Sequence, residues 1–195
     1  MSAKTRRFVP RLECFDERAL PSVSYVLSGA TLFVHGDAAA NTITINDDGS
    51  ATGVSVTSAD GNNWAAGTAI SSVFVDAQGG NDTVVYNLNV PDVNGQHAPM
   101  TVNRLVDVDL GVGNDAYTAN IAGQSLAPFV NLDLSGHGHG GKDSMILNAQ
   151  NVSTASGSVL NVDFSGDAGK DVIQFNYSAG IDASGLVVFT KDQKH

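Results

Sequence analysis

Apolar and polar residues alternate with a period of two along most of the chain. The clearest alternating segments are residues 73–77, 106–110, 130–134 and 160–164. Valine, leucine or phenylalanine recurs at alternate positions, and the residues between them are polar in the later segments, at Asp107, Asn131 and Asn161. Such alternation is typical of strands with one buried face. The pattern therefore predicts an all-β protein.

Each of these segments opens a repeated unit of strand, turn and strand. The second halves of the units align without gaps as GGNDTVVYN (79–87), VGNDAYTAN (112–120), GGKDSMILN (140–148) and AGKDVIQFN (168–176). A glycine precedes an aspartate in each turn, and an asparagine ends each unit. Gly supplies positive φ and Asp caps its own backbone, so this is a turn signal. A degenerate copy stands at 32–46, where His35 and Asn41 replace the two aspartates of a unit.

Two architectures can use such a unit. If the copies stack as successive coils, the result is a parallel β-helix, or β-solenoid, of about five coils. If the two strands of a unit pair as a hairpin, the result is an antiparallel β-sandwich. Stacking explains the repeated asparagines, because side-chain amides can form a hydrogen-bonded ladder. These are Asn46, Asn87, Asn120, Asn148 and Asn176. We expect residues 26–195 to form the repeat domain and residues 1–25 to form an arm.

Stacking would also align the aspartates in two columns. One column holds Asp82, Asp115, Asp143 and Asp171, and the alignment places Asp76, Asp109, Asp133 and Asp163 in the other, with insertions in the last two turns. Unit charges about 4.8 Å apart repel by about 0.9 kcal/mol even in bulk water, so the columns need hydration or a cation. Carboxylates and turn carbonyls suit Ca²⁺. The predicted metal residues are these eight aspartates with Gly80, Gly113, Gly141 and Gly169.

Lysine precedes the aspartate in the third and fourth turns, at Lys142 and Lys170. An ammonium group there could neutralise the carboxylate without a metal. We therefore expect the loops at 76–82 and 109–115 to be the better calcium sites. The alternative is that all four are ordinary turns with hydrated aspartates.

Composition narrows the function classes. The chain has 20 acidic and 10 basic residues, and its only glutamates are Glu13 and Glu17. A net charge of −10 disfavours nucleic-acid binding, which needs a basic stripe, and docking on anionic lipid. No apolar run is long enough to predict a membrane span. The single cysteine, Cys14, excludes a disulfide within the chain.

GGNDTVVYN resembles the calcium-binding nonapeptide of the RTX, or hemolysin-type, repeat family, in which Gly-x-Asp is followed by a large apolar residue. The resemblance implies Ca²⁺ held between coils of an exported β-roll. The copies here are 28 to 33 residues apart, whereas family repeats run in direct tandem. In addition, RLECFDERALPS (11–22) resembles an N-terminal segment of exported planctomycete repeat proteins. This second resemblance implies an extracellular or cell-surface location.

The sequence therefore predicts a secreted or surface-attached, calcium-binding structural or adhesive module. The alternative is a carbohydrate-active β-helix protein that binds or cleaves polysaccharide. No catalytic residue is predicted, because the paired aspartates recur in every copy whereas an active site is normally singular. His137 and His139 could bind a transition metal, but two ligands on a glycine-rich loop are too few alone. The expected partners are calcium and extracellular polysaccharide or other cell-surface components.

Overall fold

The computed structural model describes residues 22–65, 67–94, 96–178, 182–183 and 185–192. Cys14 and all of the export-type segment except Ser22 lie outside these residues. The described chain is all-β, as predicted, and contains no helix that could cross a membrane. The first strand begins at Ser24, at the end of the predicted arm.

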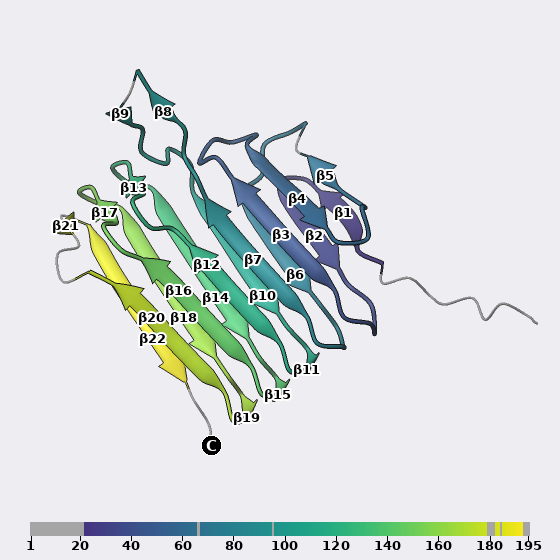
Figure 1. Cartoon of the computed structure of the whole chain (residues 1–195). Coiled ribbons are helices and arrows are strands. Elements are labelled where there is room, and N and C mark those ends of the chain that lie inside the picture. Colours follow the sequence, from purple (N-terminus) through teal and green to yellow (C-terminus); the bar gives the residue numbers. More distant parts are fainter. Residues whose placement is uncertain (1–21, 66, 95, 179–181, 184, 193–195) are drawn as a thin grey trace, which may run out of the picture.

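Two seven-stranded sheets make up most of the protein (Figure 1). The first has the order β1 (Ser24–Ser28), β2 (Thr31–His35), β6 (Ser72–Asp76), β10 (Arg104–Asp109), β14 (Asn131–His137), β18 (Val159–Ser165) and β22 (Leu186–Asp192). The second has the order β20 (Val172–Tyr177), β16 (Ser144–Ala149), β12 (Ala116–Asn120), β7 (Thr83–Leu88), β3 (Thr42–Asp47), β4 (Val54–Ser58) and β5 (Trp64–Ala65).

Short strands connect the two large sheets. One three-stranded sheet holds β11 (Val112–Gly113), β15 (Gly140–Gly141) and β19 (Ala168–Gly169). Another holds β13 (Ser125–Leu126), β17 (Ser153–Thr154) and β21 (Asp182–Ala183). A small hairpin pairs β8 (Asp92–Val93) with β9 (Gln96–His97). The chain runs from β10 through β11 to β12, then through β13 to β14, and repeats this route to β22.

Equivalent strands of successive copies pair in parallel. β10 lies between β6 and β14, and β12 lies between β7 and β16. The two strands of a unit thus belong to different sheets, and the hairpin pairing of the sandwich alternative is wrong for these copies. Antiparallel pairs occur elsewhere: β1 with β2, β3 with β4, β4 with β5, and β8 with β9. The sheets are therefore mixed, and most of their pairs are parallel.

The predicted alternation sets the core. Val73 and Val75 of β6 are buried, as are Tyr117 and Ala119 of β12, and all four belong to one apolar cluster drawn from both large sheets. The predicted asparagine ladder is also confirmed. Each side-chain amide donates to the amide oxygen of the preceding copy, over N···O distances of 3.1, 2.9, 2.8 and 2.9 Å from Asn87 to Asn176.

Candidate functional site

The turns that lead from the first large sheet to the second have one constant length, which corrects the alignment of the first aspartate column. The register places His35, Asp76, Asp109, His137 and Ser165 side by side. From each of these residues, the buried Asn or Asp of the second column is six residues further on. The insertions expected in the third and fourth turns are therefore absent.

Asp133 and Asp163 do not belong to that column. Asp133 pairs with Leu105 and Asn161, and Asp163 pairs with Ser135 and Thr190. The sequence alignment slipped by four and by two residues because the buried positions continue past the apolar segments, at Gly136 after 130–134 and at Gly166 after 160–164. An even slip leaves every side chain on its face, so alternation alone cannot detect it.

The second column is present as predicted, but its side chains are buried under the turns. Asp82, Asp115 and Asp143 are only 1–2% exposed, and Asp171 is 9% exposed. The Oδ1 atom of each accepts a backbone N–H from the equivalent residue of the preceding copy. The donors are Asn41 at 2.7 Å, Asp82 at 2.6 Å, Asp115 at 2.9 Å and Asp143 at 2.9 Å. These bonds continue the parallel pairing around the corner between the sheets.

The second oxygen of three aspartates has no partner. The Oδ2 atoms of Asp82, Asp115 and Asp143 are buried and make no hydrogen bond with the described residues. Burial raises the pKa of Asp82 and of Asp143 to about 6, although a backbone N–H lowers each of them. Burial also raises the pKa of Asp115, again opposed by a backbone N–H. A buried carboxylate with an unpartnered oxygen is costly, so this column favours a bound proton or a cation.

We expect Asp143→Asn to change how stability depends on pH. Because the folded protein holds a proton on Asp143 up to about pH 6 and an unfolded aspartate releases it near pH 4, the contribution of Asp143 to stability falls as pH rises through this window. The difference is on the order of 2 kcal/mol, or roughly 4–8 °C in melting temperature. Thermal melts in chelator from pH 4.5 to 7.5 should show a smaller fall for the variant. Parallel curves for the two proteins would contradict a buried, protonatable Asp143.

The predicted turn glycines have a steric role. A Cβ atom on Gly113 would lie 1.6 Å from the carbonyl oxygen of Gly80, and one on Gly141 would lie 1.4 Å from that of Gly113. A Cβ atom on Gly169 would lie 1.8 Å from the carbonyl oxygen of Gly141. The column of glycines therefore lets the carbonyls of one turn approach the backbone of the next turn.

Lys142 and Lys170 do not neutralise the buried aspartates as the sequence predicted. Both side chains are exposed, whereas the carboxyl groups lie beneath the turn. Among the described residues, Lys142 forms no ion pair with Asp143. The third turn therefore resembles the first two in its electrostatics, and the expected preference for loops 76–82 and 109–115 loses its basis.

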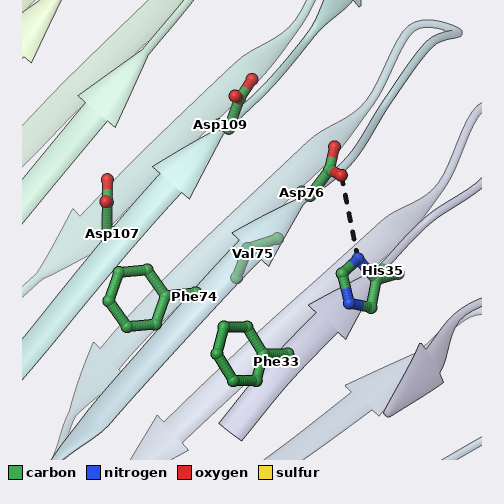
Figure 2. Close-up of a pocket in the computed structure, with 7 residues that line it drawn as sticks. All are labelled: Phe33, His35, Phe74, Val75, Asp76, Asp107 and Asp109. Carbon is green, nitrogen blue, oxygen red and sulfur yellow. Dashed lines mark ion pairs between the residues drawn. The ribbon is translucent and has the colours of Figure 1, made fainter. Parts of the chain in front are cut away.

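A flat aromatic surface lies on the outer face of the first sheet. Phe33 of β2 and Phe74 of β6 pair across the strands, with ring centroids 5.6 Å apart and planes 18° apart. The ring of His35 lies 6.4 Å from that of Phe33 and is inclined to it by 5°. Figure 2 shows the three rings side by side with their faces turned to the viewer. We refer to Phe33, Phe74 and His35 as the aromatic platform.

Three aspartates border the aromatic platform and, with it, line a shallow cavity of about 200 Å³ (Figure 2). Asp76 Oδ2 lies 3.8 Å from His35 Nδ1, and Asp109 Oδ1 lies 3.0 Å from His139 Nε2. Asp107 Oδ1 accepts the Ser135 hydroxyl at 2.6 Å and lies 3.7 Å from His137 Nε2. His137 and His139 thus each face one aspartate of β10. In the part of the chain that the structure describes, no three acidic, histidine or cysteine side chains converge as a metal cluster.

A buried ion pair was not predicted. Arg104 and Asp47 are fully buried, and the guanidinium donates from Nε to Oδ2 at 2.7 Å and from Nη2 to Oδ1 at 3.1 Å. Tyr86 also donates to Asp47, and Arg104 to the carbonyl of Ser50. The one sequence signal for the burial of Arg104 is its position just before the alternating segment 106–110. The partners are 57 residues apart, so nothing local links them.

No family model, curated protein or solved structure matches this chain. The resemblance to RTX repeats accordingly rests on the turn residues alone.

Proposed function

We propose that the protein is a parallel β-helix that serves as an exported, non-catalytic structural or adhesive module, and that Ca²⁺ stabilises its turns. The parallel pairing of equivalent strands and the repeated route between the two large sheets support the β-helix. A continuous stack of hydrogen-bonded copies suits a stiff scaffold. The resemblance of residues 11–22 to an export-associated segment supports the location.

The observation that carries the calcium proposal is the line of buried carboxyl groups with unpartnered Oδ2 atoms at Asp82, Asp115 and Asp143. At acidic pH a proton can stabilise each group. Above about pH 6 the protons leave Asp82 and Asp143, and a cation becomes the remaining means of offsetting the charge. Ca²⁺ prefers hard oxygen ligands, and these carboxylates would hold it with backbone carbonyls and water completing the shell. Asp76 and Asp109 border the same turns. They are the two predicted aspartates of the first column that pair in register with each other.

We expect Ca²⁺ to raise the melting temperature at pH 7.5 and to have less effect at pH 5, where protons compete. At a calcium concentration 100-fold above Kd, the gain would be about 2.7 kcal/mol. For a domain of this size that corresponds to roughly 5–11 °C. Differential scanning calorimetry in chelator and in excess Ca²⁺ measures the effect.

Asp115→Asn should weaken this response, and Asp133→Asn provides the matched control. Asp133 was predicted as a ligand from sequence, but the register places it away from the turn column. An identical melting temperature with and without Ca²⁺ at pH 7.5 would refute calcium stabilisation. Equal losses in the two variants would show that the effect arises from general surface charge.

A further inference from the structure

The aromatic platform and its bordering carboxylates form a surface that does not include the buried aspartates of the turns. We propose that it binds a pyranose ring of a neutral glycan. This inference names a partner for the adhesive role proposed above, but it requires neither calcium nor the buried aspartates of the turns.

The shape of the platform favours a sugar ring. Because Phe33, Phe74 and His35 lie side by side with nearly parallel planes, they present one flat surface and not a cage. A pyranose has a face of C–H groups that can pack flat on aromatic rings, while its hydroxyl groups point outward at the rim. Val26, which is 53% exposed and pairs with Phe33 across β1 and β2, extends the apolar surface.

The carboxylates supply the polar contacts that a sugar needs. Asp76, Asp107 and Asp109 each use one oxygen for the contacts described above, and no described residue forms a hydrogen bond with their second oxygens. These second oxygens can accept hydrogen bonds from hydroxyl groups, and bonds to an ionised acceptor are strong. Binding sites commonly combine an apolar floor with a few placed polar groups in this way.

Size and charge narrow the class of glycan. A cavity of about 200 Å³ is smaller than those that enclose drug-sized ligands and suits a single ring on an open face. Three carboxylates would repel an anionic sugar such as a uronate. A quaternary ammonium would be attracted to the charges, but recognition of such cations uses rings that surround the ligand. The coplanar rings therefore favour a neutral pyranose.

The test measures binding of neutral oligosaccharides (cellohexaose, xylohexaose and mannohexaose) by NMR titration and calorimetry in excess chelator. Phe33→Ala and Phe74→Ala should each weaken the binding of a neutral oligosaccharide by about tenfold or more. Phe129→Ala is the matched control, because Phe129 is 78% exposed and lies outside the platform. That variant should bind as the parent does, and unchanged melting curves would confirm that the outward-facing variants remain folded.

Further probes separate the other outcomes. Polygalacturonate should not bind. Asp107→Asn should lower the affinity for the neutral oligosaccharide less than either phenylalanine substitution does. Binding of choline or a trimethyl-lysine peptide without any neutral oligosaccharide would overturn the proposal in favour of a cation site. Absence of binding to all three neutral probes, or equal binding by the phenylalanine variants, would also overturn it. Asp115→Asn should retain glycan binding, so failure of this proposal is distinguishable from failure of the calcium proposal.

Discussion

Arg104→Leu is expected to lower the free energy of unfolding by about 3–5 kcal/mol, which is the usual cost of removing one partner of a buried ion pair. The substitution leaves the carboxylate of Asp47 fully buried without its cation, and among the described residues the Tyr86 hydroxyl and the Gly49 N–H are its remaining donors. The change also removes the bond from Arg104 to the carbonyl of Ser50, which lies in the segment between β3 and β4. Urea denaturation at pH 7 measures the loss.

The double variant Asp47→Asn with Arg104→Leu is the control for this result. An amide in place of the carboxylate keeps an acceptor oxygen for the Gly49 N–H and can donate its NH2 to the Tyr86 hydroxyl. It also removes the buried charge, so we expect the double variant to regain part of the stability lost by Arg104→Leu. If the double variant is less stable than the single variant, the loss comes from the missing side-chain contacts of Arg104 and not from an uncompensated charge.

Gly141→Ala is expected to cost more than about 4 kcal/mol, enough to prevent folding of a marginally stable domain. The added Cβ atom would lie 1.4 Å from the carbonyl oxygen of Gly113, and the φ of Gly141 is +153°, which side chains rarely adopt. Backbone on both sides of the contact belongs to stacked turns, so a local shift would disturb the copies on either side. Soluble yield and thermal melting measure the effect.

Gly140→Ala, one residue earlier in β15, is the matched control. A Cβ atom there meets no heavy atom within 4 Å, and Gly140 has no positive φ. Its stability should therefore change by no more than about 0.5 kcal/mol. Similar melting temperatures for the two variants would show that the turns can separate at little cost, contrary to the close stacking of Gly113 on Gly141.

Much of the fold could be predicted from residue patterns. The two-residue alternation identified the strands and their buried faces, because a strand turns successive side chains to opposite sides. The asparagine column identified which copies stack, since an amide ladder forms only between equivalent positions. The four buried aspartates were found in the same way, from their fixed distance to those asparagines.

Predictions that depended on the burial of a side chain or on the register of a strand were less successful. The alignment misplaced Asp133 and Asp163 because a slip by an even number of residues preserves the alternation. Lys142 was expected to neutralise Asp143, yet adjacent residues at the turn point to opposite sides, one to solvent and one inward. The burial of a carboxyl group depends on the chain that covers it, which no local pattern reveals.

The sequence by itself determined the strands, the glycine turns and the ladder of equivalent positions, because each depends on the order of residues within one copy or on its repetition. Only the tertiary structure decided which unlike residues meet. Arg104 meets Asp47 although the two residues occupy non-equivalent positions and are 57 residues apart in the chain. The register between copies is set by packing across the whole core, so the platform and the buried ion pair exist only once the copies have stacked.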